Sequence, residues 1–211
     1  MMKNQLLPEV QAFVEGLELS IIPKERQEIL QKLSTYIQDK LEKKEEVHLN
    51  FICTHNSRRS QLCQVWAYTA AFYHGLDQFT AFSGGTEATA FHPNAVRALK
   101  NAGFRISKYE KERNPVYSIA CSVEADPLAC FSKLYHDPAN VAPFAAVMTC
   151  SEADINCPFI PEAETRFSIT YEDPKIADGT PQEEQIYAER NRQIASEMFY
   201  LFSQIKLSND K

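Results

Sequence analysis

The feature that most constrains the fold is an apolar segment that leads through a short polar loop into a helix. Residues 47–52, Val-His-Leu-Asn-Phe-Ile, have the length and the β-branched and aromatic content of a strand. A loop at residues 53–60 follows, and apolar side chains then recur at helical spacing until Gly75 ends the helix. The sequence therefore predicts a strand, a loop and a helix in immediate succession, with the helix running from Ser60 to about Gly75.

The alternation of strands and helices continues along the chain. The further expected elements are strands at residues 79–83 and 145–149 and helices at residues 93–102 and 182–205. Strands that alternate with helices predict an α/β fold with a parallel sheet. Between residues 107 and 144 several prolines break any long helix, and only residues 116–120 offer a strand.

The first 46 residues are expected to be helical. Apolar side chains recur at helical spacing near the start, and a second, longer helix begins at Pro23, a residue type favoured in a first helical turn. The charged run at residues 40–46 is typical of a solvated helix end. We interpret this segment as a helical hairpin.

Composition argues against two classes of function. A net charge of −6 and a pI near 5.4 disfavour nucleic-acid binding, which needs clustered positive charge. No apolar stretch approaches the roughly 18 residues that a membrane-spanning helix needs, and no apolar leader follows the first residues. We therefore expect a cytoplasmic protein whose six cysteines are reduced thiols rather than a disulfide framework.

The loop at residues 53–60 has the residue types of a nucleophilic anion site. A helix N-terminus presents unpaired N–H groups and a positive dipole end, which bind an anion and favour the reactive thiolate of Cys53. Arg59 carries a fixed charge on a planar fork that can donate two parallel hydrogen bonds to a tetrahedral oxyanion. Ser60 is placed to donate to the Cys53 sulfur, and Asn56 to hold the loop by side-chain hydrogen bonds.

Residues 53–61, Cys-Thr-His-Asn-Ser-Arg-Arg-Ser-Gln, resemble the active-site loop of the low-molecular-weight protein tyrosine phosphatase superfamily, and most of all its thioredoxin-coupled arsenate reductases. The resemblance continues through Phe-Ser-Gly-Gly-Thr-Glu at 82–87 and His-Pro-Asn-Ala-Val at 92–96, and again from residue 150 to 174. It implies a small, parallel, four-stranded sheet with helices on both faces. It covers roughly residues 47–107 and 145–205.

The same resemblance implies a division of the chain. Residues 1–46 would be an N-terminal helical extension, and residues 47–207 the phosphatase-like or arsenate-reductase-like α/β domain. Residues of about 108–144 would be an insertion in that domain. The position of this insertion relative to the site is left open by the sequence.

Three residues are expected to carry the first chemical step. Cys53 is the nucleophile, Arg59 the oxyanion clamp, and Asp173 the general acid, since it resembles the family's Asp-Pro acid on a proline-stiffened loop. The loop residues expected to bind the oxyanion are Thr54, His55, Asn56, Ser57, Arg58, Arg59 and Ser60. Cys63 and Trp66, on the following helix, are interpreted as packed side chains, and Lys175 stands where phosphatases often have a tyrosine.

Two further thiols follow the expected strand at 145–149. Cys150 and Cys157 have the separation of a two-cysteine relay in the arsenate reductases, and Asn156-Cys157-Pro158 fits that pattern. The resemblance implies that Cys150 attacks Cys53 and that Cys157 then captures Cys150.

Three functions remain open at this point. The favoured one is an arsenate reductase that uses Cys53, Cys150 and Cys157, with thioredoxin as reductant. The second is a phosphatase that hydrolyses phosphomonoesters through a phosphocysteine, and the third a non-catalytic oxyanion sensor. The substrate would be a small oxyanion or a phosphorylated molecule, with no bound cofactor and no metal.

Three positions depart from the family's usual residues. His55 stands where the family usually has glycine and Arg58 where it commonly has cysteine. Gln64 stands where the reductases often have a potassium-binding glutamate, so no cation site is predicted.

Overall fold

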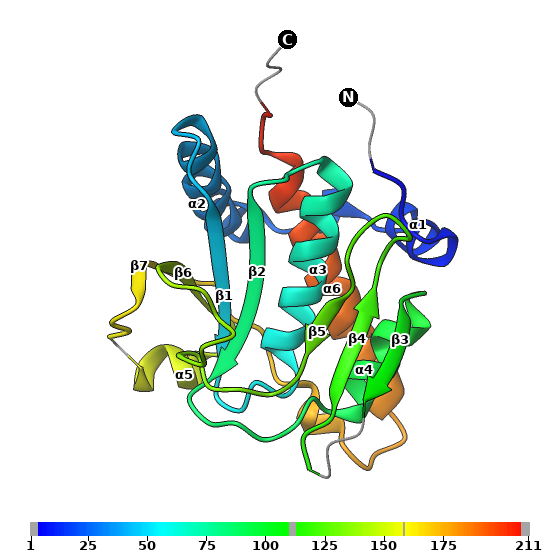
Figure 1. Cartoon of the computed structure of the whole chain (residues 1–211). Coiled ribbons are helices and arrows are strands. Elements are labelled where there is room, and N and C mark those ends of the chain that lie inside the picture. The colour runs from blue at the N-terminus through cyan, green and yellow to red at the C-terminus, as the bar shows by residue number, and fades with distance from the viewer. Residues whose placement is uncertain (1–3, 110–112, 158, 208–211) are drawn as a thin grey trace.

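A four-stranded parallel sheet forms the centre of the computed structural model, which describes residues 4–109, 113–157 and 159–207 (Figure 1). Its strands are β1 (Val47–Cys53), β2 (Phe79–Gly85), β6 (Phe144–Met148) and β7 (Ala163–Ser168), in the order β2-β1-β6-β7. All three pairings are parallel. The predicted small parallel sheet is therefore confirmed.

Helices cover both faces of this sheet. Leu49 and Phe51 of β1 face the main core, which is shared with α2 (Lys24–Glu42), α3 (Arg59–His74) and α6 (Glu183–Ser203). The alternate β1 residue Ile52 faces a smaller cluster with α5 (Ser151–Asn156). This division follows from the alternation of side chains along a strand. The predicted helices at 60–75 and 182–205 correspond to α3 and α6.

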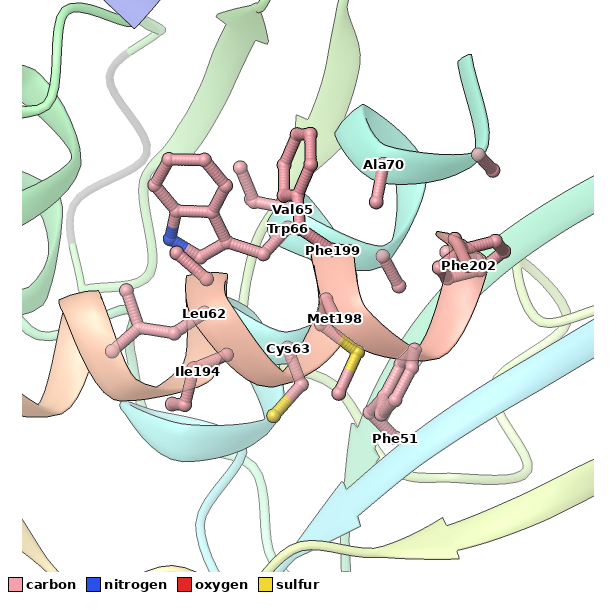
Figure 2. Packing of buried hydrophobic residues seen from close by; sticks show 14 of the residues in the cluster. Phe51, Leu62, Cys63, Val65, Trp66, Ala70, Ile194, Met198, Phe199 and Phe202 are labelled. Carbon is pink, nitrogen blue, oxygen red and sulfur yellow. The ribbon is translucent and has the colours of Figure 1, made fainter. Parts of the chain in front are cut away.

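The main core is built where α3 crosses α6 above β1. Figure 2 shows Trp66 and Leu62 of α3 meeting Ile194, Met198 and Phe199 of α6, all of them buried. The Trp66 ring is fully enclosed, with Phe13 stacked at 5.3 Å and Phe104 edge-on at 4.9 Å. Trp66 is thus a core residue, as its position on the predicted helix indicated.

A second, antiparallel sheet lies on the other side of α3 and α6 (Figure 1). It contains β3 (Arg105–Tyr109), β4 (Val116–Ala120) and β5 (Leu128–Cys130), in the order β3-β4-β5. Only the β4 segment was predicted as a strand. β3 and β5 were not predicted, because β3 is mostly exposed and β5 is short, so neither has a clear apolar pattern. The predicted helix at 93–102 is α4 (Pro93–Asn101).

The predicted helical hairpin at the N-terminus is wrong. Both helices exist, but α1 (Pro8–Glu15) and α2 lie on opposite sides of the molecule, joined through the 3₁₀ turn η1 (Leu19–Ile21) (Figure 1). Near α1, the backbone N–H of Leu7 donates to the carbonyl of Cys121 at 2.8 Å, whereas on α2 Lys40 pairs with Glu164 at 3.0 Å. Each apolar stripe therefore packs on the α/β domain rather than on the other helix. The division at residue 46 and the insertion at about 108–144 remain predictions.

The remaining described element is the 3₁₀ turn η2 (Pro174–Ala177), which follows Asp173. Within the described ranges, none of the helices combines the length and the apolar character needed to cross a membrane.

A buried hydrogen bond between α3 and α6 provides a test of this packing. The indole Nε1 of Trp66 donates to Oδ1 of Asn191 at 2.7 Å, and Nδ2 of Asn191 donates to the carbonyl of Ala98 at 3.3 Å. Asn191→Ala leaves the buried indole N–H unpaired, so we expect the free energy of unfolding to fall by about 2 kcal/mol in urea titrations. The matched control Asn101→Ala removes an exposed amide contact and should change it by less than about 0.5 kcal/mol. Equal losses in both variants would contradict this assignment.

Candidate active site

The loop after β1 holds its shape through one asparagine. Asn56 is buried and has a φ of 47°, in the left-handed region that asparagine tolerates better than most residues. Its Nδ2 donates to Oγ of Ser60 at 2.8 Å, and its Oδ1 accepts from Nε2 of Gln61 at 3.1 Å. Asn56 therefore ties the loop to the first turn of α3, as expected. The positive φ falls on this residue and not on His55, where the family's glycine is replaced.

The segment at residues 131–133 braces the loop from the side. The backbone N–H of Lys133 donates to Oδ1 of Asn56 at 2.9 Å, and Oγ of Ser132 donates to the carbonyl of His55 at 2.9 Å. Gln61 completes the brace, since its Nε2 also donates to the carbonyl of Phe131 at 2.8 Å. Part of the predicted insertion is therefore in direct contact with the loop, a contact that the sequence left open.

The end of β2 fixes the other side of the loop. The N–H of Glu87 donates to the carbonyl of Thr54 at 2.8 Å, and that of Thr86 to the carbonyl of Cys53 at 3.2 Å. Gly85 allows this approach, because a Cβ there would lie 2.7 Å from the carbonyl oxygen of Thr54. The stretch at 82–87 thus acts as a support for the loop.

The thiol of Cys53 lies at the bottom of a small cavity. Only 3% of the residue is exposed, and its Sγ is 3.1 Å from Oγ of Ser60, the contact expected from the sequence. The cavity is lined by Cys53, His55, Ser57, Arg58, Arg59 and Asp173. The structure therefore brings together the predicted nucleophile, the predicted clamp and the predicted acid.

Arg59 and Asp173 are in direct contact at this cavity. Nη2 of Arg59 donates to Oδ2 of Asp173 at 2.6 Å, and Nη1 donates to the carbonyl of Tyr171 at 3.1 Å. Nε of Arg59 is buried and has no hydrogen-bond partner among the described residues. A buried donor without a partner is costly, so this N–H is suited to an oxyanion acceptor.

Arg58 also lines this cavity, but its guanidinium binds Tyr187 of α6 and Asp178. Its Nε donates to the hydroxyl of Tyr187 at 2.6 Å and its Nη2 to Oδ2 of Asp178 at 2.8 Å. Tyr187 in turn donates to Oδ1 of Asp178 at 2.7 Å and stacks on the ring of His92 with centroids 5.6 Å apart. The guanidinium of Arg58 is therefore held by protein partners. Sequence reasoning assigned no role in the site to Asp178, His92 or Tyr187.

The ionisable groups of this network have shifted pKa values, and those of Asp178 and His92 decide the charges beside Arg58. Burial alone would raise the pKa of Asp178, but the hydrogen bond from Tyr187 and the charge of Arg58 hold that pKa below its ordinary value. Burial, followed by the nearby charge of Arg58, lowers the pKa of His92. Both shifts favour a neutral imidazole and a charged carboxylate beside Arg58 at neutral pH.

The second pair of predicted thiols lies at the two ends of α5. Cys150 is fully buried at the N-cap, where its Sγ accepts from the N–H of Ala153 at 3.3 Å and is 3.5 Å from Oγ1 of Thr54. Cys157 is partly exposed at the C-cap. All three predicted reactive cysteines contact the same small apolar cluster beneath β1 and β6, with Tyr135 at its edge. Pro158, quoted above with Cys157, lies outside the described residues.

The other three thiols are buried in the core. Burial raises the pKa of Cys121 to about 11 and that of Cys130 to about 12, and it holds the pKa of Cys63 well above its ordinary value. These groups stay protonated at neutral pH and are poor nucleophiles, which agrees with the packed role expected for Cys63. Across the described ranges, no group of three or more His, Cys, Asp or Glu side chains is placed to hold a metal ion.

Comparison with known proteins agrees with this geometry. No protein-family model matches the chain. An arsenate reductase from Bacillus licheniformis is 29% identical over 154 residues, which is 73% of this chain and 93% of that protein. An arsenate reductase from Bacillus subtilis is 31% identical over 142 residues, or 67% and 84% of the two chains. A low-molecular-weight protein tyrosine phosphatase from T. tengcongensis shares the fold, with a TM-score of 0.50 and 16% identity over 76% of this chain and all of that one.

The strand, loop and helix around Cys53 and the parallel sheet that carries them define a phosphatase-like fold with a cysteine at its oxyanion loop. The chain belongs to the family of the arsenate reductases that it matches in sequence, and it shares its fold with a low-molecular-weight protein tyrosine phosphatase.

The shifted pKa of Asp178 predicts a pH-dependent stability. A carboxyl whose folded pKa is depressed contributes stability above its unfolded value, near 3.8, and loses that contribution as the pH falls through the folded value. Asp178→Asn should therefore lower the free energy of unfolding by about 1 kcal/mol at pH 7 and by nearly nothing at the lowest pH at which the protein stays folded. The exposed Asp77→Asn should show no such pattern in urea titrations across pH. A deficit in Asp178→Asn that is constant with pH would contradict the charge pairing.

Proposed function

We propose that the protein is an arsenate reductase that binds its oxyanion over the Cys53 sulfur. The observation that carries the proposal is the convergence of three thiols, Cys53, Cys150 and Cys157, on one small cluster beside the loop. The side chains of Asn56, Ser57 and Arg58 bind protein partners, so the oxyanion would be held mainly by backbone N–H groups of the loop and by Arg59.

The first step is attack of the Cys53 thiolate on arsenate. A sulfur–arsenic bond forms, an arsenic–oxygen bond breaks, and the leaving oxygen takes a proton from Asp173 to depart as water. Arg59 would exchange Asp173 for the oxyanion when substrate enters, since both compete for the same guanidinium. Ser60 stabilises the sulfur before and after attack.

The second step is thiol exchange. The Cys150 thiolate attacks the Cys53 sulfur, a disulfide bond forms, and the electron pair of the sulfur–arsenic bond goes to arsenic, which leaves as arsenite. Cys157 then attacks the Cys150 sulfur and frees the Cys53 thiolate. The resulting Cys150–Cys157 disulfide needs an external dithiol, for which we propose thioredoxin from the family resemblance. A cytoplasmic location is the matching expectation, since the cycle needs a reducing compartment.

This relay requires α5 to unwind. A rise of about 1.5 Å per residue separates the Cα atoms of Cys150 and Cys157 by roughly 10 Å along the helix, whereas a disulfide needs about 4.4–6.8 Å. α5 contains only six residues, and a helix this short has little stability of its own, so its opening is feasible. Cys157 is the partly exposed member of the pair and therefore the one suited to move.

Phosphomonoester hydrolysis is the second candidate. The contact between Arg59 and Asp173 places a potential proton donor at the mouth of the Cys53 cavity, which a phosphatase needs as well. Hydrolysis would use Cys53, Arg59 and Asp173 and leave Cys150 and Cys157 idle. The two functions therefore differ in their need for the later thiols.

Substitution of the thiols separates these functions. We expect the wild type to reduce arsenate with thioredoxin, thioredoxin reductase and NADPH, followed by NADPH absorbance, and Cys150→Ser to lower turnover at least about a thousandfold because no second thiol remains to attack Cys53. Cys53→Ser should abolish arsenate reduction and any hydrolysis of p-nitrophenyl phosphate. The control Cys130→Ser should retain arsenate reduction. A wild type that hydrolyses the ester but reduces no arsenate, with Cys150→Ser unchanged, would support the phosphatase instead.

Oxidation should open α5. The bonds from the N–H of Asp154 to the carbonyl of Cys150 and from the N–H of Cys157 to the carbonyl of Ala153, both 3.0 Å, must break when the disulfide forms. After a turnover with arsenate in the absence of reductant, hydrogen exchange of these amides should rise at least about tenfold. Cys157→Ser cannot form this disulfide and should keep its exchange rates. Rapid closure of the disulfide with both amides still protected would contradict the proposed movement.

A further inference from the structure

A partly buried ion pair links the N-terminal helix α2 to α6. Nε and Nη2 of Arg26 both donate to Oε2 of Glu197, at 2.9 and 2.7 Å, and the two side chains are 16% and 4% exposed. The second carboxylate oxygen of Glu197 accepts from Nε2 of Gln193 at 3.0 Å. With two donors directed at one oxygen, the plane of the Arg26 guanidinium is fixed.

The fixed guanidinium lies over an aromatic ring next to the active site. The Cζ atom of Arg26 is 4.8 Å from the centroid of the Tyr171 ring, within the range of a cation–π contact. Tyr171 is 5% exposed, and its hydroxyl has no hydrogen-bond partner among the described residues. The ring is therefore held by packing and by the adjacent Arg26–Glu197 pair, whose charges also act on its hydroxyl.

The backbone of Tyr171 is part of the site itself. Its carbonyl accepts from Nη1 of Arg59 at 3.1 Å, and its N–H donates to the carbonyl of Thr149 at 3.1 Å. Asp173, two residues later, binds Nη2 of the same guanidinium. A displacement of Tyr171 would move both the acceptor that aims Arg59 and the loop that carries Asp173.

We propose that Arg26 is a positioning residue for the reaction, and that α2 acts through it to hold the Tyr171–Asp173 segment in place against Arg59. The inference rests on the proposed function in one respect, since the roles of Arg59 and Asp173 in the chemistry belong to that proposal. It assigns a task to the N-terminal segment, which the chemistry described above does not use.

Hydrogen exchange tests the physical contact without any assay of activity. Arg26→Ala removes the cation but leaves Glu197 buried and unpaired, so the second variant is Arg26→Met combined with Glu197→Met, which replaces the pair with apolar side chains of similar length. The matched control is Arg192→Ala, whose guanidinium lies 4.5 Å from the Phe13 ring and donates to the carbonyl of Gly16 at 3.0 Å. Arg192 also joins α6 to the N-terminal segment but does not touch Tyr171.

Both Arg26 variants should speed exchange of the Tyr171 and Lys175 amides by about tenfold, as expected for loss of a desolvated cation–π contact. These amides donate to Thr149 and to Asp173 respectively. Arg192→Ala should leave both unchanged. Unchanged exchange in the double variant would overturn the proposal, whatever the activity of the protein.

The catalytic readout is the dependence on the leaving group. A poor leaving group needs protonation by Asp173, whereas p-nitrophenolate needs little. The double variant should therefore lose about tenfold more kcat/KM on phenyl phosphate than on p-nitrophenyl phosphate, because kcat/KM reports the step in which the leaving group departs, with partial recovery in Arg26→Lys. Equal losses on the two esters, despite faster exchange at Tyr171, would reduce Arg26 to a structural contact and overturn the positioning role. If the wild type neither hydrolyses these esters nor reduces arsenate, the proposed function fails, and the exchange data still decide the contact.

Discussion

The site depends on a loop whose backbone is held open by hydrogen bonds from outside it. Backbone N–H groups converge on an anion only if the loop does not collapse to satisfy them internally. Asn56 keeps the loop open by adopting a left-handed conformation, which costs about 1–2 kcal/mol for an ordinary residue. Its side chain also makes buried hydrogen bonds with Ser60, Gln61 and Lys133, each worth about 1 kcal/mol. The bonds outweigh the strain, so the loop is formed before any ligand arrives.

The two adjacent arginines of the loop differ in their charged and polar partners. Arg58 and Arg59 would repel each other and any competing cation, yet each is matched by its own aspartate on the segment that follows β7, Asp178 and Asp173 respectively. Both arginines donate from two nitrogens, but Arg58 uses its Nε to bind Tyr187 of α6, whereas the buried Nε of Arg59 has no partner among the described residues. One guanidinium therefore fixes the loop to the domain, and the other is available for an oxyanion.

Much of the site could be predicted from residues that are close together in the sequence. The features that could not be predicted depend on contacts between residues far apart in the sequence. The strand, loop and helix around Cys53 follow from residues within one short stretch, so they were found, as was the contact of Ser60 with the sulfur. Which way Arg58 points depends on Asp178, 120 residues away, and no local pattern encodes that choice. The prediction of a helical hairpin is wrong for the same reason. An apolar stripe shows that one side of α2 is buried, but not that α6 is the helix it packs against.

Burial also explains how thiol chemistry could be confined to three of six cysteines. Cys63 and Cys130 are enclosed by apolar side chains that raise their pKa values, so they stay as inert thiols near the reacting ones. Cys150 is equally buried but has polar neighbours: its Sγ accepts from the N–H of Ala153 at 3.3 Å and lies 3.5 Å from the hydroxyl of Thr54, which donates to Glu152 at 3.1 Å. The proposed relay thiol thus lies among polar groups, whereas the effect of burial dominates around Cys63 and Cys130.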